Sequence, residues 1–387
     1  MPRKVAVVAA GSTRYGDSPL GVREMVREAV AECAASAERG IDLREVREAY
    51  VASLGFGGGQ LGNLAATLNE TAGLRLVSAR RVENACASGG FAFRDAVLSV
   101  ASGETDVALA VGVERMNDQT GLRKRYWLGV SGDTEWERMA GLTFPGVYAM
   151  MASRHMHEFG TKREDLAAVA VKNHAYGALN PKAQFQRVIS AEDALKAPSV
   201  AAPLGLFDCC ATTDGAAAVI VAAEERALEF TETPVWVRGS AGASDFLAAH
   251  ERASLTRLDA TARAAKQAFE RAGVTPADID VAEVHDCFTI AEIMATEDLG
   301  FCKKGEGGAF AREGQSKVGG KVAVNASGGL KAKGHPLGAT GVGQVYELVR
   351  QLRGHAEPGR QVPDAELGLA HNVGGSGATC AVHILSR

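Results

Sequence analysis

The sequence predicts an α/β protein made of two similar halves. Strand-like apolar runs alternate with helix-like stretches over most of the 387 residues, which is typical of a largely buried mixed sheet covered by helices. Glycine is abundant, with 45 residues, and aromatic residues are only 6% of the chain, as in α/β enzymes with many close backbone approaches. A chain of this length fits about two to three domain-sized units.

In the first half, apolar patterns predict a strand near residues 5–10, a helix near 22–39 and a strand near 48–53. A tight turn around Cys86 follows and starts a helix that ends near residue 102. The next strand covers residues 106–114. These alternating elements give the first half its predicted α/β character.

The second half repeats this order. Residues 262–286 contain a helix, a glycine turn and a strand, in the same succession as residues 29–53. The strand-like residues 214–221 likewise resemble residues 375–382. Because there are only two copies, the self-similarity predicts two related α/β halves packed together and not a solenoid.

A polar stretch over residues 116–203 separates the halves, and its pattern predicts irregular structure. Insertions of this size are often lids or binding loops, but a structural elaboration or an oligomer contact explains it equally well. We expect an N-terminal half over residues 1–115 with 204–232, an inserted loop region over 116–203, and a C-terminal half over 233–387. Large apolar side chains of the inserted region are Trp127, Trp136, Phe144, Tyr148, Met150 and Met151.

Charge and cysteine usage exclude several classes of protein. The net charge of −4 gives no basic field for nucleic acid or an anionic membrane surface. No apolar run approaches the roughly 20 residues that span a bilayer. The N-terminal residues 1–4 lead straight into a strand-like run, without the apolar core of a signal peptide. Seven irregularly spaced cysteines without a CxxC pair argue against a disulfide framework or a structural zinc site, and favour a cytoplasmic location.

Cys86 lies at the junction of a strand-like run and a helix, in the sequence VENACASGG. A helix N-terminus carries partial positive charge and free N–H groups, which favour a nucleophilic thiolate. The small neighbouring residues leave room for a bulky acyl substrate. A lone cysteine of this kind is more often a buried structural residue, so the catalytic interpretation depends on the motifs downstream.

A second motif, EVHDCF, ends a strand-like run over residues 279–284. His285 and Cys287 are two residues apart, so in an extended segment both point to the same side, while Asp286 faces the other way in a structural role. One hydrogen-bond donor and one acid/base group would then share a pocket. The alternative is a core histidine beside a buried cysteine.

In a third motif, His335 lies between Gly334 and Pro336, within the sequence NASGGLKAKGHPLGATG. A histidine in such a rigid turn is poorly explained by packing, because glycine allows close backbone approach and proline fixes the turn. This is how a catalytic base is presented to a nucleophile. The run contains no GxxxxGK[ST] phosphate loop, and no GxGxxG fingerprint follows the first strand.

The fourth motif, LAHNVGGSG, connects the last two predicted strands. Its glycines, including Gly374, suit a backbone loop that lines a pocket. His371 or Asn372 would reach into the pocket, or both would only support the turn.

Together these four motifs resemble the thiolase superfamily, in the family's order and over essentially the whole chain. The nearest subgroup is that of the archaeal-type acetoacetyl-CoA thiolases and the sterol-carrier-protein-type thiolases, with the Cys86 turn, an HDCF box at 285–288, a GHxxGATG box at 334–341 and an NxGG loop at 372–375. Residues 133–137 and 144–151 also resemble this subgroup. The resemblance implies a thiolase fold, in which two similar α/β halves pack as five αβαβα layers with an inserted loop domain.

The implied reaction is reversible acyl transfer between a 3-oxoacyl-CoA and CoA, most simply acetoacetyl-CoA and CoA to and from two acetyl-CoA. Cys86 would form the acyl-enzyme. His335 would take the thiol proton and help hold a thioester oxyanion, and His285, which stands where other thiolases carry the Asn of an NEAF box, would contribute to the second oxyanion site. The second catalytic cysteine of a CxG loop is missing, since that position reads Asn372-Val373-Gly374, and Cys287 would take over its acid/base role.

The resemblance also implies ligands and partners. Coenzyme A would be a substrate contacting Tyr148, Phe288 and the 116–203 region, with no metal and no redox cofactor. Family members form dimers through edge strands and often tetramers, and archaeal-type members associate with a small zinc-binding OB-fold protein and a hydroxymethylglutaryl-CoA synthase.

Three alternatives stay open. A β-ketoacyl synthase also uses one cysteine and two histidines, as Cys86, His285 and His335 would allow, but its decarboxylating condensation needs no base such as Cys287. A thiolase-like aldolase cleaves a β-hydroxyacyl-CoA, but such members generally lose the nucleophile that this chain retains. A non-catalytic scaffold is the third alternative, and the four reactive elements in one chain argue against it.

Overall fold

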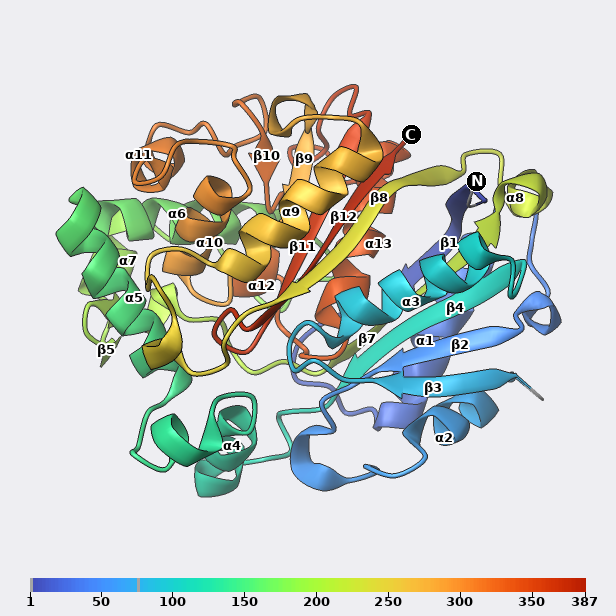
Figure 1. The fold of residues 1–387 in the computed structure, drawn as a ribbon, viewed down its shortest axis with the longest axis horizontal. Helices are drawn as coiled ribbons and strands as arrows, with labels where there is room; N and C mark the ends of the chain where they lie inside the picture. The colour runs from blue at the N-terminus through green and yellow to red at the C-terminus, as the bar shows by residue number, and fades with distance from the viewer. Residues whose placement is uncertain (1–2, 75–76) are drawn as a thin grey trace.

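One continuous mixed sheet of ten strands runs through the molecule, in the order β10-β9-β11-β12-β8-β1-β7-β4-β2-β3 (Figure 1). The computed structural model describes residues 3–74 and 77–387, so the first two residues of the N-terminal segment discussed above lie outside the described residues. The strands of the first half are β1 (Val5–Ser12), β2 (Glu48–Ala52), β3 (Ser78–Val82), β4 (Val107–Glu114) and β7 (Gly215–Ala223). Those of the second half are β8 (Val235–Ser244), β9 (Val281–Glu283), β10 (Ala323–Val324), β11 (Leu367–Gly374) and β12 (Thr379–Ser386).

The sheet consists of two half-sheets with the same topology. When the strands of each half are numbered in chain order, both half-sheets have the order third, second, fourth, fifth, first from the outer edge to the centre of the sheet. The two first strands, β1 and β8, pair antiparallel at the centre. β9 therefore corresponds to β2 and β12 to β7, which confirms the internal repeat predicted from the sequence. Strands such as β7, GAAAVIVAA, are buried along their whole length because helices cover both faces of the sheet.

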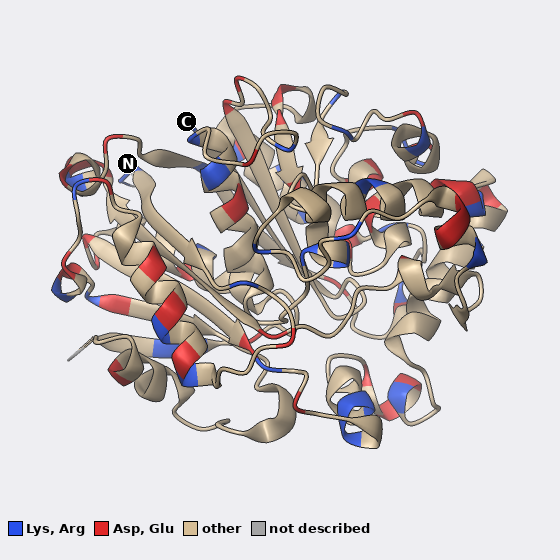
Figure 2. Cartoon of the chain, turned by 180° about the vertical axis from the view of Figure 1, so that it is seen from behind, with Lys and Arg blue, Asp and Glu red and all other residues tan. Residues whose placement is uncertain are grey.

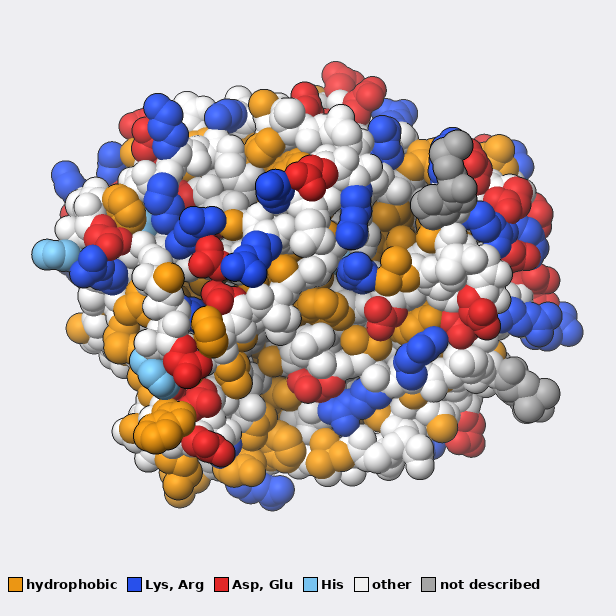
Figure 3. Space-filling view, in the orientation of Figure 1, with side chains coloured by type: hydrophobic (Ala, Val, Ile, Leu, Met, Phe, Trp, Pro, Cys, Tyr) orange, Lys and Arg blue, Asp and Glu red, His pale blue; other side chains and the backbone are white. Residues whose placement is uncertain are grey.

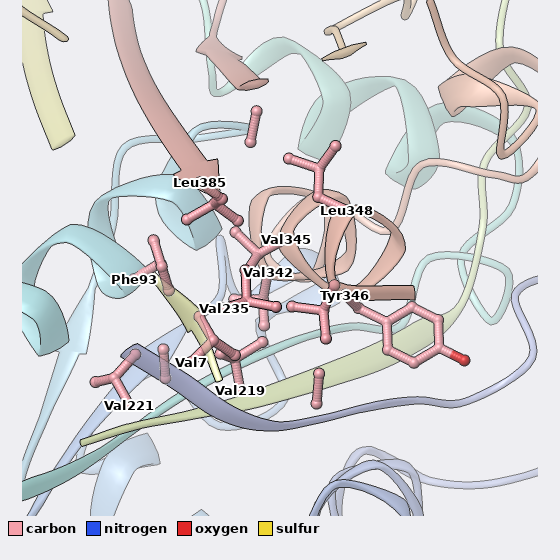
Figure 4. Close-up of a cluster of buried hydrophobic side chains, with 14 of the residues drawn as sticks. Val7, Phe93, Val219, Val221, Val235, Val342, Val345, Tyr346, Leu348 and Leu385 are labelled. Carbon is pink, nitrogen blue, oxygen red and sulfur yellow. The ribbon is translucent and has the colours of Figure 1, made fainter. Parts of the chain in front are cut away.

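Helices form three layers around the two half-sheets. The central layer consists of α3 (Ser88–Ser102) and α13 (Thr340–Leu352), which occupy equivalent positions in the two halves. Figure 4 shows Phe93 of α3 and Val342 of α13 packed with Val7 and Val219 of the first half-sheet. The outer layers are formed by α1 (Val22–Ala35) with α2 (Leu64–Thr71) on one side, and α9 (Asp259–Ala272) with α10 (Thr289–Asp298) on the other. The result is the expected succession of five αβαβα layers.

The segment between the halves is largely helical, so the prediction of irregular structure over residues 116–203 was wrong. Thr143 caps α5 by accepting a hydrogen bond from Gly146, and a proline near the start of this helix suits its first turn. α5 and α6 bury Val147, Met151 and Leu166 against α10. α6 also buries polar residues such as Lys172 and Asn173, which pair with Glu292 of α10. The helices of this segment are α4 (Gly121–Gly129), a π-helical turn (Thr134–Arg138), α5 (Phe144–Phe159), α6 (Arg163–Leu179) and α7 (Ala191–Lys196).

The remaining elements are short: β5 (Ser199–Ala201), β6 (Leu204–Gly205), α8 (Glu224–Phe230), α11 (Gly307–Arg312) and α12 (Gly329–Ala332). Figure 2 shows acidic and basic residues interspersed on the outer helices and loops, while the strands carry few charges. None of the helices in the described part of the chain has both the length and the apolar character needed to cross a bilayer.

Candidate active site

The sequence motifs converge on a cavity of about 130 Å³ between the two halves. Cys86, Cys287, Phe288 and His335 all line it. The repeat explains their convergence, because Cys86 lies just before α3 and His335 just before α13, the two paired central helices. Apolar side chains of Met116, Leu128, Phe144 and Leu337 complete much of the wall, so a bound thioester would react in a nearly dry environment.

Cys86 is held in a tight turn at the end of the strand-to-helix connection. Ala85 adopts a positive φ of 49°, and the Ser88 hydroxyl closes the turn by accepting a hydrogen bond from the Asn84 N–H at 2.9 Å. The backbone N–H groups of Cys86 itself and of Gly375 both approach the Cys86 sulfur. N–H groups close to the sulfur are the kind of donor that can stabilise an oxyanion on an acyl group attached there.

Burial determines the charge state of the Cys86 thiol. Loss of solvation raises its pKa to about 12, and the neighbouring Cys210 and Glu114 act in the same direction. The helix N-terminus was predicted to favour the thiolate, but burial outweighs it and Cys86 is held as a thiol. The positive end of one helix is a smaller effect than the removal of water from a fully buried sulfur. Cys86 needs a base to become a nucleophile.

His335 is suited to be that base. Burial lowers its pKa to about 3, so the imidazole is neutral and able to accept a proton. The Thr340 hydroxyl donates to the carbonyl of Pro336 at 2.9 Å and accepts from His335 Nδ1 at 2.7 Å. The ring proton consequently lies on Nδ1, and Nε2 keeps a free lone pair.

The raised pKa predicts how Cys86 responds to alkylation. Below a pKa near 12, the thiolate fraction rises about tenfold for each pH unit, so the iodoacetamide rate constant for Cys86 should rise steadily from pH 6 to pH 9. Peptide mass spectrometry, with Cys302 as an internal reference for a thiol outside the cavity, would follow each site. A plateau above pH 7 would instead indicate a thiolate–imidazolium pair and contradict this prediction.

His285 lies beside His335, with the two rings edge to face and their centroids 5.0 Å apart. Its Nδ1 accepts a hydrogen bond from the Asn372 amide at 3.2 Å, so its proton is on Nε2, a buried atom without a partner in the described part of the protein. One ligand atom each of Cys86, His285 and His335 lies within 4.8 Å of the others. Neither nitrogen of His285 offers a free lone pair, however, so this trio suits proton transfer better than metal coordination.

Cys287 lines the same cavity from the segment that connects β9 to α10. Burial raises the pKa of its thiol, while a hydrogen bond with the Tyr148 hydroxyl opposes that shift, and the protonated thiol can act as an acid. Tyr148 is buried behind Phe288, with ring centroids 4.4 Å apart and nearly parallel planes. Of the two residues predicted to contact CoA, Phe288 therefore faces the cavity and Tyr148 supports it.

Asp286 points away from the cavity, as the alternation of the extended segment predicts. Its carboxylate accepts hydrogen bonds from the N–H of Leu330 at 2.7 Å and from the side chain of Asn173 at 2.7 Å. It thereby ties the loop of His285 and Cys287 to α12, which precedes His335.

The C-terminal end of β11 supports the nucleophile, so His371, Asn372 and Gly374 lie on a strand and not in the loop predicted from the sequence. Asn372 contacts Cys86 and His285, whereas His371 lies behind them, between Thr261 and the His285 backbone. Gly374 packs so closely against the Cys86 turn that a Cβ atom would collide with the Asn84 carbonyl.

Sequence reasoning missed three contributors to this site. Gly375, rather than its neighbour Gly374, lines the cavity and faces the sulfur. Thr340 sets the orientation of His335. Glu114 accepts backbone hydrogen bonds from Leu54, Gly55, Phe56 and Gly338 and so joins the loops of both halves. Glu114 could have been found from the sequence, because it is a charged residue at the end of the apolar run 107–114. A charged side chain that is buried must have hydrogen-bond or ionic partners.

Comparisons with known proteins agree on one family. The models "Thiolase, N-terminal domain" and "Thiolase C-terminal domain-like" match residues 5–225 and 241–387. The acetyl-CoA acetyltransferase of Methanothermobacter thermautotrophicus is 46% identical over 387 residues, which are 100% of each chain. Among solved structures, the Ltp2-ChsH2(DUF35) aldolase is similar with a TM-score of 0.87 and 25% identity, covering 100% of this chain and 98% of the other. Human mitochondrial 3-ketoacyl-CoA thiolase has a TM-score of 0.77 at 18% identity, covering 100% and 99%.

Proposed function

Because the chain belongs to the thiolase family, we propose that it transfers an acyl group reversibly between a 3-oxoacyl-CoA and CoA, with acetoacetyl-CoA as the simplest substrate. The observation that carries the proposal is that Cys86 and Cys287, two of the cysteines that line one apolar cavity, share it with the basic histidine His335. One thiol serves covalent catalysis and the other acid/base catalysis. The similarity to an acetyl-CoA acetyltransferase along the whole chain supports the acetyl substrate.

In the cleavage direction, Cys86 attacks the 3-keto carbon while His335 Nε2 takes the thiol proton. The oxyanion that forms is stabilised by the N–H groups of Cys86 and Gly375, which already approach the sulfur. Removing one such donor typically costs 10²–10³ in rate, so their placement matters.

The bond between the keto carbon and the α-carbon then breaks. The electron pair moves into the thioester of the departing acetyl-CoA, whose oxygen receives hydrogen bonds from His285 Nε2 and from protonated His335. The Cys287 thiol protonates the α-carbon, and the proton held by His335 restores this thiol. The unpartnered, buried His285 Nε2 is consistent with a site completed by a substrate oxygen.

CoA completes the cycle by attacking the acyl group on Cys86. His335 accepts the proton of the CoA thiol and returns it to Cys86, so all protons balance without a metal or a redox cofactor. The apolar side chains around the cavity, among them Leu128, Phe144 and Phe288, suit the pantetheine arm and the acyl group.

The test is the CoA-dependent loss of acetoacetyl-CoA by the purified protein. Turnover that forms two acetyl-CoA per acetoacetyl-CoA is the expected result. Two parallel assays address the alternatives: malonyl-CoA decarboxylation for a synthase, and CoA-independent cleavage of 3-hydroxyacyl-CoAs for an aldolase. Activity only in one of these would replace the proposal, and inactivity in all of them would support a scaffold.

We propose that the protein also works as an oligomer with partners, namely a small zinc-binding OB-fold protein and a hydroxymethylglutaryl-CoA synthase. The similar aldolase structure contains a second component, ChsH2(DUF35), which supports a two-protein arrangement. Exposed apolar side chains around α4 offer a place for a partner near the cavity, which α4 also lines through Leu128 (Figure 3). The exposed set is Leu122, Tyr126, Trp136 and Met139.

A further inference from the structure

The side-chain amide of Asn372 is fixed in one orientation by the main chain of the nucleophile turn. Its Oδ1 accepts the Gly90 N–H at 3.0 Å, and its Nδ2 donates to the Cys86 carbonyl at 3.0 Å. In a flipped amide, Nδ2 would face the Gly90 N–H, which is also a donor, and Oδ1 would face the Cys86 carbonyl, which is also an acceptor. The backbone therefore determines which end of the amide faces His285.

The second Nδ2 hydrogen of Asn372 is directed at His285 Nδ1, at 3.2 Å. A neutral imidazole carries one proton, so an accepting Nδ1 requires the proton to be on Nε2. His335 is in the opposite state, with its proton on Nδ1 and held by Thr340. Two neighbouring histidines in one apolar site thus differ in the nitrogen that carries the proton.

We infer that Asn372 is a positioning residue that commits His285 to donating a hydrogen bond from Nε2 and leaves His335 as the base for Cys86. This inference rests on the proposed function. An acceptor at the same place would move the His285 proton to Nδ1. The donor for the thioester oxyanion would then be lost, although the ring would remain in position.

Three ionisable side chains lie around the His285 ring in the part of the protein that the structure describes. They are His335 from the loop before α13, His371 on β11 and Cys86 before α3. The His371 Nδ1 accepts the His285 backbone N–H, and its Nε2 is paired with Thr261. Burial, followed by these two histidines, keeps the His285 pKa far below its usual range, so the wild-type donor is neutral at neutral and alkaline pH.

The first test is Asn372→Asp, which keeps the size of the side chain but replaces the donor by an acceptor. We expect kcat/KM for acetoacetyl-CoA at pH 8 to fall by about 10²–10³, the typical effect of losing one oxyanion donor. Because a carboxylate stabilises imidazolium, which carries protons on both nitrogens, part of the activity should return as the pH is lowered from 8 to 6. In the His285→Gln background, the glutamine amide can donate a hydrogen bond whichever side chain stands at position 372. Adding Asn372→Asp to this background should therefore lower kcat/KM by less than about tenfold. An equal loss in both backgrounds would overturn the inference.

A second measurement needs no turnover. The ¹⁵N NMR spectrum of histidine-labelled protein distinguishes protonated from bare ring nitrogens, and the difference between wild type and His285→Gln identifies the His285 signals. We expect a protonated Nε2 and a bare Nδ1. The reverse pattern would overturn the inference about Asn372, even if the wild-type protein is fully active. The expected pattern in a wild-type protein without thiolase activity would support the inference while the proposed function fails.

Discussion

Replacing Cys86 by alanine is expected to abolish the cleavage of acetoacetyl-CoA, with kcat falling on the order of 10⁴-fold or more. The thiol forms the covalent intermediate, and removing a nucleophile leaves only the binding and oxyanion contributions. The variant should also fail to gain the mass of an acetyl group when the protein is incubated with acetyl-CoA and analysed intact by mass spectrometry.

Cys380→Ala is the matched control for this prediction. Cys380 is also a fully buried thiol whose pKa is raised to about 12 by burial, but it packs against Thr261 away from the cavity. The control should keep turnover within about threefold of wild type, because its thiol takes no part in the transition state. Acetylation of the Cys86→Ala protein, or an equal loss of activity in Cys380→Ala, would contradict the assignment of Cys86 as nucleophile.

Replacing Cys287 by alanine should separate the two half-reactions. Acetyl transfer between acetyl-CoA and labelled CoA uses only Cys86 and His335 and should stay within about threefold of wild type. Cleavage of acetoacetyl-CoA requires protonation of the α-carbon and should fall by about 10²–10⁴, the usual contribution of a general acid. Isotope exchange and the acetoacetyl-CoA assay on the same preparation measure both rates.

Cys210→Ala is the control here, since Cys210 lines the same cavity and donates its backbone N–H to the Cys287 carbonyl. The proposed reaction gives its thiol no role, so both rates should remain near those of wild type. If Cys287→Ala lost exchange as well as cleavage, Cys287 would be needed for acylation, and the proposed division of labour would be wrong.

Much of the fold could be predicted from the sequence because it depends on local patterns. The apolar runs of β1 and β7, the glycine turn after α9 and the repeated order of elements all follow from the period of the side chains and from turn chemistry. The inserted segment was misjudged because α6 buries polar side chains, such as Lys172 and Asn173, together with its apolar ones, so no clear apolar stripe marks the helix. The partner of these polar groups, Glu292 on α10, is far away in the sequence.

The catalytic groups could be read from the sequence motifs: the thiols of Cys86 and Cys287, two histidines, and the glycines that let loops approach them. The state in which each group is held depends on the folded protein. Burial outweighs the helix end in setting the protonation of Cys86. Asn372, which is distant in sequence from His285, determines which nitrogen of His285 carries the proton. Thr340, in the first turn of α13, does the same for His335. These properties depend on water removed and on hydrogen bonds made between the two halves, which exist only once the halves have packed together.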